Sequence, residues 1–249
     1  MNKTKSKIIN IICTAITALL LFATGGCPGS LTSIRGNGNV KQQNFSLNSF
    51  KTVSISGDWT VEITRNGTFS VTVDADENLF DYLDIQVNDS GNNLHIGFKK
   101  GYAISNAHCK ASITMPVLTQ LTASGSLTGT ISSFDMHRGT MTIDVSGSGD
   151  ITARNIDVKK LELNISGSGS FTASGKAEHM RAAISGSGNI KATDLKAEYA
   201  DISISGSGSA NVWVTKVLRA DISGSGSIWY KGDPAIIRKI SGVGSVSPL

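Results

Sequence analysis

The sequence predicts an all-β protein, a parallel β-helix or solenoid with about 20 residues per coil and a hairpin-containing N-terminal half. Three observations predict this fold class. A Ser-Gly phrase returns at a regular interval, apolar and polar residues alternate on both sides of each phrase, and only one short segment has a helical pattern.

The repeated phrase is Ser-Gly-Ser-Gly or a close variant of it. Its first serines are Ser124, Ser146, Ser166, Ser185, Ser205, Ser223 and Ser241. The steps between them are 22, 20, 19, 20, 18 and 18 residues. Such a period is typical of solenoids, in which each coil buries its apolar side chains only against the neighbouring coils.

Residues at equal distances from these serines form columns, that is, positions that stack on one another in successive coils. The column just before the serine is apolar: Val145, Ile165, Ile184, Ile204, Ile222 and Ile240. The columns three and five residues before the serine, and five and seven after it, are also apolar, with Arg238 as an exception. Apolar residues at every second position predict strands with one buried face.

Each Ser-Gly phrase is predicted to be a corner between two strands, because a flexible linker would not lie between periodic apolar columns. Glycine reaches positive φ values there at low steric cost. We expect the serine hydroxyls to bond to backbone groups that the bend leaves unpaired. One outward column alternates in charge, as ion pairing between neighbouring coils would select, although a solvated face with modest stabilisation is the favoured interpretation: Glu162, Arg181, Asp201 and Arg219.

Residues 36–120 are an irregular front half of the same domain, and residues 121–249 are the repeat coils. Asn66-Gly67 lies between two alternating runs and predicts a hairpin. A second hairpin is predicted around Asp89-Ser90-Gly91. The segment 76–83 is the one stretch with a helical pattern.

The first 26 residues have the layout of a secretory signal peptide, with lysines, an apolar stretch and then small residues. They resemble a bacterial lipoprotein signal, which makes Cys27 the predicted lipidation site and the membrane a partner through that lipid. Residues 27–35 would then be a tether, and the expected location is the cell envelope, anchored to the outer membrane. An ordinary secretory signal and an uncleaved membrane anchor are the alternatives.

Charge and cysteine content limit the function classes. The chain has 23 basic and 19 acidic residues, and three of the basic ones, Lys3, Lys5 and Lys7, lie in the signal. The remaining balance of 20 to 19 argues against a nucleic acid partner. Cys109 is the one cysteine left beyond Cys27, and it is interpreted as an idle thiol. We expect no cofactor, no metal and no catalytic residues.

The densest carboxylate group in the sequence gives an enzymatic alternative. Its members are Asp74, Asp76, Glu77, Asp81 and Asp84. They could serve a carbohydrate-active enzyme or hold calcium. Acids in the first turn of a helix and in a solvated loop are the structural interpretation.

Trp213 and Trp229 are candidate ligand-binding residues in the last coils. Both are predicted to point outward from neighbouring coils, where two indoles would form a platform for a sugar ring or a partner side chain. The alternative is a cap, in which Trp229 folds over the last apolar layer of the solenoid.

Three features together resemble one bacterial family, that of the putative auto-transporter adhesins with a head GIN domain: "FKTVSISGDWTVEIT", "VTVDADENLFDYLDIQV" and the serial "ISGSG" units. The resemblance covers roughly residues 42–232. It implies an exported or lipid-anchored protein with a right-handed parallel β-helix-like fold, and it implies no catalytic residues.

The sequence therefore predicts a non-enzymatic cell-envelope lipoprotein that serves adhesion or binds a glycan or protein ligand. A carbohydrate-active enzyme and a purely structural envelope component are the alternatives. Neither the ligand nor the oligomeric state follows from the sequence.

Overall fold

The structure, a computed structural model, describes residues 32–88 and 90–249. The predicted signal peptide and Cys27 lie outside the described residues. Thr32–Leu249 form one compact unit. In the described part of the chain the one helical element is a short 3₁₀ helix, η1 (Glu77–Tyr82), which falls where the sequence has its helical pattern. No helix in that part is both long and apolar enough to span a membrane.

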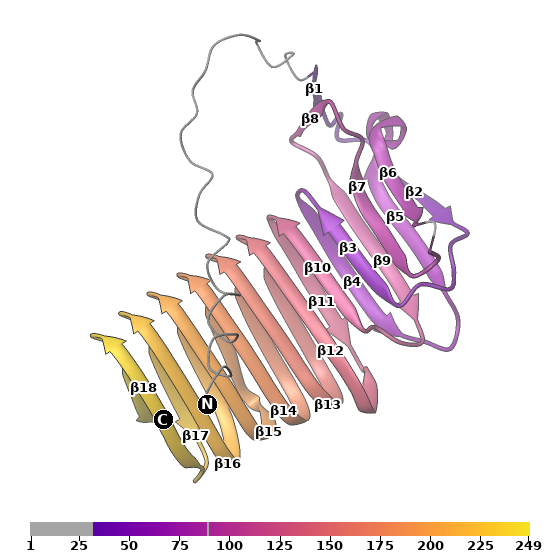
Figure 1. Cartoon of the computed structure of the whole chain (residues 1–249). Coiled ribbons are helices and arrows are strands. Elements are labelled where there is room, and N and C mark those ends of the chain that lie inside the picture. Colours follow the sequence, from indigo (N-terminus) through magenta and orange to yellow (C-terminus); the bar gives the residue numbers. More distant parts are fainter. Residues whose placement is uncertain (1–31, 89) are drawn as a thin grey trace, which may run out of the picture. The chain divides into compact units, whose positions relative to one another are not determined.

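The repeat coils form a β-solenoid, as the sequence predicts. Four long strands each make one coil: β13 (Asp150–Gly167), β14 (Ser170–Gly186), β15 (Asn189–Gly206) and β16 (Ser209–Gly224). Neighbouring coils pair in parallel with like residues aligned, so that Ser166 lies beside Ser185 and Ser185 beside Ser205. Figure 1 shows these strands stacked side by side along the solenoid.

Each coil has three sides around a common core. In β13 the alternation of buried and outward residues is interrupted at Arg154–Asn155 and again at Lys159–Lys160, and the Ser-Gly phrase makes the third corner. The inward residues are Ile151, Ala153, Ile156, Val158, Leu161, Leu163 and Ile165, all of them buried. The predicted apolar columns are therefore the core of the protein.

The Ser-Gly corners depend on glycine. Gly186 has φ of +122°, and a Cβ atom placed there would lie 2.6 Å from the carbonyl oxygen of Gly167 in the preceding coil. The prediction that serine hydroxyls satisfy the bend is wrong. Backbone groups of adjacent corners bond to each other instead, as in Ser187 N–H to Gly167 O at 2.9 Å. Corners stacked at the ordinary interstrand spacing satisfy each other, and the hydroxyls of Ser170, Ser209 and Ser245 bond to side chains of the neighbouring coil instead.

The coil pattern continues upstream into the front half. The strands of its parallel coils are β3 (Thr52–Ser56), β4 (Trp59–Arg65), β7 (Asn93–Phe98), β9 (Cys109–Met115), β10 (Gln120–Gly125), β11 (Leu127–Ser132) and β12 (Asp135–Gly147). β3 pairs in parallel with β10 and β7, and β4 with β11 and β9. The front half therefore belongs to the same sheet system.

Antiparallel strands close the N-terminal end of the stack. They are β2 (Val40–Phe45), β5 (Ser70–Asp76) and β6 (Leu83–Val87), at the purple end in Figure 1. The hairpin predicted between residues 83 and 98 is confirmed, because β6 pairs antiparallel with β7. The hairpin predicted at Asn66-Gly67 is wrong, because β9 lies between β4 and β5 and pairs with both. A separate pair of parallel strands consists of β1 (Thr32–Arg35) and β8 (Tyr102–Ser105).

Within residues 32–88 and 90–249, no antiparallel strand covers the C-terminal end of the stack. Its strands are β17 (Ser227–Lys231), β18 (Ala235–Gly242) and β19 (Ser245–Pro248). Ile236 and Ile240 continue inward columns, yet they are 36% and 37% exposed because no further coil lies on them in the described structure.

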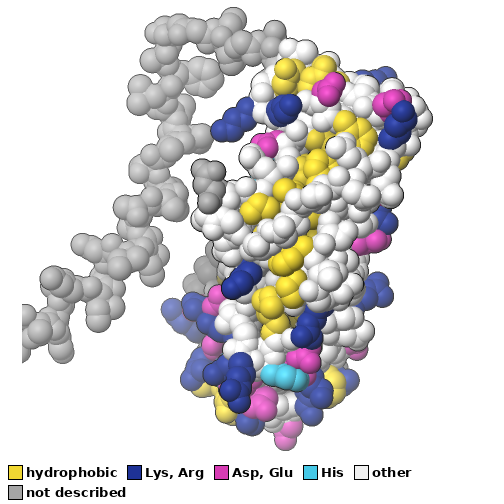
Figure 2. All heavy atoms as spheres, turned by 90° about the vertical axis from the view of Figure 1, so that its right-hand side faces the viewer, with side chains coloured by type: hydrophobic (Ala, Val, Ile, Leu, Met, Phe, Trp, Pro, Cys, Tyr) yellow, Lys and Arg dark blue, Asp and Glu magenta, His cyan; other side chains and the backbone are white. Residues whose placement is uncertain are grey.

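The charged residues of β12–β16 lie outside the coils. The alternating column is in register as predicted, but the one ion pair that joins its members in the described structure is Arg219–Asp201, at 3.6 Å. Glu162 instead pairs with Lys160 of its own strand, at 2.5 Å. Figure 2 shows charged side chains of both signs crowding the lower part of one face and hydrophobic side chains running along its middle.

Candidate functional site

Trp213 lies between two lysines on the outer surface of the last coils. Its in-register neighbours are Lys196 in β15 and Lys231 in β17. The Nζ atoms of these lysines lie 5.6 Å and 4.3 Å from the centre of the indole ring. Both distances are within the range of a cation–π interaction, so the ring holds an ammonium group of each neighbouring coil in place.

Counting residues from the serines of the repeat does not place Lys196 beside Trp213. Lys196 is 11 residues after Ser185, whereas Trp213 is only eight after Ser205. β16 lacks three residues of the corner that β15 has between Ala192 and Lys196, and the register shifts there. The short 18-residue steps were the signal in the sequence that could have revealed the missing corner.

Trp229 occupies a different outward column. Its in-register neighbours are Asn211 and Ser247, and it follows the buried Ile228. It is partly exposed, as is Trp213. Beside it the Oδ1 atom of Asn211 is buried without a hydrogen-bond partner in the described structure.

The two tryptophans therefore face outward on adjacent coils but are offset by two residues along the strand. Trp229 is aligned with Asn211, two positions before Trp213. The cap alternative has no support, because Trp229 is in an outward column and Ile236 and Ile240 remain exposed at the end of the core. The geometry is that of a staggered pair of indoles flanked by lysines.

The carboxylate group of residues 74–84 is used by the fold. Asp76 is fully buried and accepts hydrogen bonds from the backbone N–H groups of Gly38 and His108, at 2.8 and 2.9 Å. Its Oδ1 atom also lies 3.5 Å from the imidazole Nδ1 of His108. These bonds tie the segment before β2 and the segment before β9 to β5.

Three other acids of this group, Asp74, Asp84 and Glu77, each bond to a different side chain. Asp74 accepts a hydrogen bond from Gln42, and Asp84 accepts one from Gln86. Glu77 pairs with Lys41, and the hydrogen bond from that ammonium lowers the pKa of the Glu77 carboxyl. Glycosidases need two carboxyl groups on opposite sides of one bound sugar. Of this group only Asp74 lines the pocket described next, so the group by itself does not form such a pair there.

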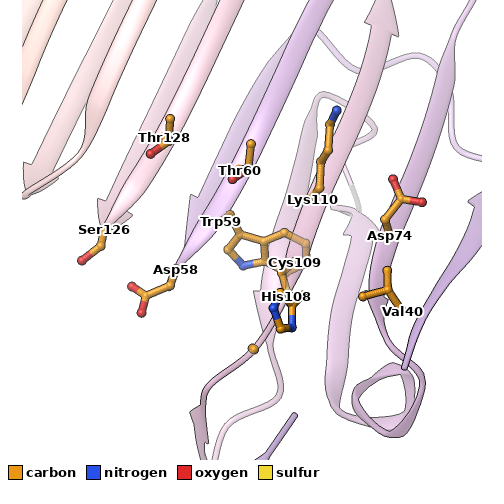
Figure 3. Close-up of a pocket in the computed structure, with 11 residues that line it drawn as sticks. Val40, Asp58, Trp59, Thr60, Asp74, His108, Cys109, Lys110, Ser126 and Thr128 are labelled. Atoms are coloured by element: carbon orange, nitrogen blue, oxygen red, sulfur yellow. The ribbon is translucent and has the colours of Figure 1, made fainter. Parts of the chain in front are cut away.

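A shallow pocket of about 420 Å³ lies near these residues in the front half. Figure 3 shows Trp59 and His108 in its middle, with Asp58 and Asp74 on opposite sides. The thiol of Cys109 also lines it, but burial and the charge of Asp76 raise the pKa of that thiol to about 12. The thiol stays protonated at neutral pH, so it is a poor nucleophile there.

No group of three or more His, Cys, Asp or Glu side chains that could hold a metal ion occurs in residues 32–88 and 90–249. The structure also brings neither Trp213 nor Trp229 near the front-half pocket, whose lining residues come from β2, β4, β5, β9, β11 and adjoining segments. The last coils and the front half are therefore separate candidate regions.

Comparisons with known proteins agree with the fold. Residues 49–234 match a family described as "Putative auto-transporter adhesin, head GIN domain". No curated protein sequence matches the chain significantly. A putative adhesin from Bacteroides fragilis NCTC 9343 has a similar structure, with a TM-score of 0.80 and 23% identity, over 87% of this chain and 100% of that one.

Two proteins of Parabacteroides distasonis ATCC 8503 are similar as well. A putative lipid binding protein has a TM-score of 0.72 and 28% identity, over 88% of this chain and 100% of that one. A putative adhesin has a TM-score of 0.65 and 26% identity, over 87% of this chain and 100% of that one. The family and two of these three relatives are described as adhesins, and none of the three is described as an enzyme.

Proposed function

The chain belongs to the family of putative auto-transporter adhesins with a head GIN domain, and from this premise we propose that it is a non-enzymatic adhesion module of the bacterial cell envelope. It binds a glycan or protein ligand through the outer surface of its last coils. The observation that carries the proposal is the staggered pair Trp213 and Trp229, both outward and partly exposed on adjacent coils.

The scaffold suits such a role because it is preorganised. Each of these coils is hydrogen-bonded to its neighbours along nearly its whole length, so outward side chains are held at fixed spacings. A rigid surface loses little conformational entropy on binding. Indoles offer a large apolar face with a polar edge, which matches the faces and hydroxyl groups of sugars.

Attachment to the membrane through a lipid on Cys27 is part of the proposal. A basic segment, an apolar stretch and small residues precede this cysteine. Replacing it, Cys27→Ala, should move the protein from the membrane fraction to the soluble fraction. A variant that stays in the membrane fraction would contradict the lipid anchor.

Adhesion is tested with the chain from residue 28 onward, applied to arrays of glycans, to extracellular proteins and to lipid vesicles. The vesicles are included because one relative is described as a putative lipid binding protein. The paired variant Trp213→Ala with Trp229→Ala should lose binding and keep its melting temperature. Tyr102→Ala, which removes an exposed aromatic ring from the front half, is the matched control.

Two outcomes would overturn the proposal. One is undiminished binding by the paired tryptophan variant, which would place the ligand elsewhere. The other is release of reducing ends from glycans by the purified protein, which would favour the carbohydrate-active enzyme.

A further inference from the structure

One outward column changes from acidic to basic along the solenoid. In register from β12 to β17 it contains Asp135, Asp157, Lys176, Lys196, Trp213 and Lys231. Its last four members, Lys176, Lys196, Trp213 and Lys231, are called the basic column below. They follow one another on successive coils, so they form a strip parallel to the solenoid axis.

The lysines of the basic column are exposed and available. None of the three is in an ion pair in the described part of the chain, and three carboxylates that line a pocket with Lys176 and Lys196 contact other side chains. Glu198 binds Lys216 at 2.6 Å, Asp157 lies 3.2 Å from His137, and Glu178 lies 3.4 Å from His179. An anionic ligand that meets the basic column therefore has no ion pair of these three lysines to displace.

The spacing of the charges follows from the coil geometry. Adjacent coils are about 4.8 Å apart, so Lys196 and Lys231 project from strands that lie about 10 Å apart, with the indole of Trp213 between them. One sugar unit of an extended polysaccharide is close in length to one coil spacing. A chain along this strip would place successive sugars opposite successive members of the column.

We propose that the basic column binds a linear acidic polysaccharide, one that carries carboxylate or sulfate groups along its length, laid parallel to the solenoid axis. The lysines meet the anionic groups and the edge of Trp213 meets a sugar ring. This proposal rests on the proposed function and names the chemical class of its ligand. Asp135 and Asp157 repel the same chain and limit the strip to the last coils.

Charge density separates this ligand from a nucleic acid. Duplex DNA carries one charge per about 1.7 Å of its axis. Three lysines spread over four coils neutralise few of those charges. They match a polymer with one anionic group on every sugar or on every second sugar. The near balance of 20 basic and 19 acidic residues beyond the signal also leaves no wider basic surface for a nucleic acid.

The test compares two triple variants with the same change in charge. The first replaces the column lysines: Lys176→Gln, Lys196→Gln and Lys231→Gln. The second, the control, replaces three exposed lysines that lie in other columns and are also in no ion pair in the described structure: Lys51→Gln, Lys100→Gln and Lys239→Gln. The ligands are heparin, polygalacturonate, neutral dextran, single-stranded DNA and phosphatidylglycerol vesicles, with calorimetry and tryptophan fluorescence as readouts.

Heparin or polygalacturonate should bind the wild-type protein, with an affinity that falls as salt rises. The column variant should lose about tenfold or more in affinity, whereas the control variant should stay within about twofold of the wild type. Trp213→Ala should weaken binding of the same ligands and leave the salt dependence unchanged, because it removes an apolar contact and no charge.

Equal losses in the two triple variants would overturn the proposal, because binding would then depend on overall charge. Tighter binding of DNA or of vesicles than of the polysaccharides would overturn it too. Binding of a neutral glycan through Trp229, with no acidic polysaccharide bound, would refute the acidic ligand and leave the proposed function intact. No binding to any glycan, protein or vesicle would refute both.

Discussion

The repeat half and the front half of the solenoid build one core from different kinds of strand pairing. From β12 to β16 the coils pair in parallel over long runs, and each residue lies beside its counterpart in the next coil. In the front half short parallel strands are extended by the antiparallel strands β2, β5 and β6. The repeat half gains its stability from one arrangement used many times, and the front half from contacts that occur once.

The difference shows how such a stack can be ended. A parallel coil offers its neighbour an edge that another coil can continue, as β18 does with Ile236 and Ile240. At the opposite end β2 presents an edge strand whose residues are almost all exposed and mostly polar. Charged and polar edge strands resist further pairing, so the antiparallel strands close the stack where more coils would otherwise add.

The largest effect is expected from a charge in an apolar column of the repeat half. Ile184→Asp places a carboxylate among buried Ile165 and Ile204, with no partner, and should lower the free energy of unfolding by more than about 3 kcal/mol. Ser185→Asp is the matched control, because the adjacent side chain is exposed and should cost less than about 0.5 kcal/mol. Chemical denaturation measures both, and equal midpoints would mean that residue 184 does not face the core.

The next effect concerns the buried carboxylate of the front half. Asp76→Ala leaves the N–H groups of Gly38 and His108 without their acceptor and should cost about 2–4 kcal/mol. Hydrogen exchange should rise around residues 36–45 and 105–110, while β13–β16 stay protected. Asp74→Ala removes only a bond to the side chain of Gln42 and serves as the control. A loss of protection spread evenly over both halves would contradict the expectation that Asp76 stabilises mainly the front half.

A smaller effect is expected where the two halves differ in their glycines. Gly186→Ala combines a φ of +122° with a Cβ–oxygen distance of 2.6 Å to the corner of the preceding coil, and should cost about 2 kcal/mol. Gly67 in the front half has no positive φ and open space around it, so Gly67→Ala should be neutral or slightly stabilising. Thermal unfolding of the two variants distinguishes a required corner from a tolerant turn. If the Gly186→Ala and Gly67→Ala proteins had equal melting temperatures, the backbones at Gly186 and Gly167 would be able to move apart at little cost.

The fold of the repeat half could be predicted because the pattern that specifies it lies within each repeat of about 20 residues. Residues such as Ile184 and Ile204 occur at the same distance from their serines, and period-two alternation fixes which side is buried. The pairing of β5 could not be predicted in this way. Asn66-Gly67 is a good hairpin turn, but β9, more than 40 residues later, takes the place beside β4. Local turn chemistry says nothing about such a long-range competitor.

The candidate site was predicted in part for a related reason. The alternation of inward and outward residues along each strand identifies Trp213 and Trp229 as outward residues. Their neighbours depend on the register between coils, and the corner missing from β16 brings Lys196 beside Trp213. The 18-residue steps are the sign of this shift in the sequence, but their length does not say which corner of the coil lacks residues.

The smallest expected effect is a dependence of stability on pH, which comes from one ion pair on the outer surface of the repeat half. The hydrogen bond from Lys160, with smaller contributions from Thr142 and Arg181, lowers the pKa of the Glu162 carboxyl. As the pH falls, the Glu162 carboxyl is therefore protonated in the unfolded chain at a higher pH than in the folded protein. The stabilisation is fully present above the ordinary glutamate pKa of about 4.3 and is lost as the pH falls through the lower pKa of the folded state. Because both side chains are about one third exposed, it should amount to a few tenths of a kcal/mol.

Lys160→Met should raise the pKa of Glu162 toward its usual value, as followed by carboxyl NMR titration, and should flatten the acid limb of the stability curve. Lys159→Met is the control, because this neighbouring lysine is exposed and takes part in no ion pair in the described residues. The front-half pair Lys41–Glu77 is more exposed, so removing Lys41 should change the titration of Glu77 with less effect on stability. An unchanged Glu162 titration in Lys160→Met, or the same change in Lys159→Met, would mean that general surface charge sets this pKa, and that the two halves do not differ in their ion pairs.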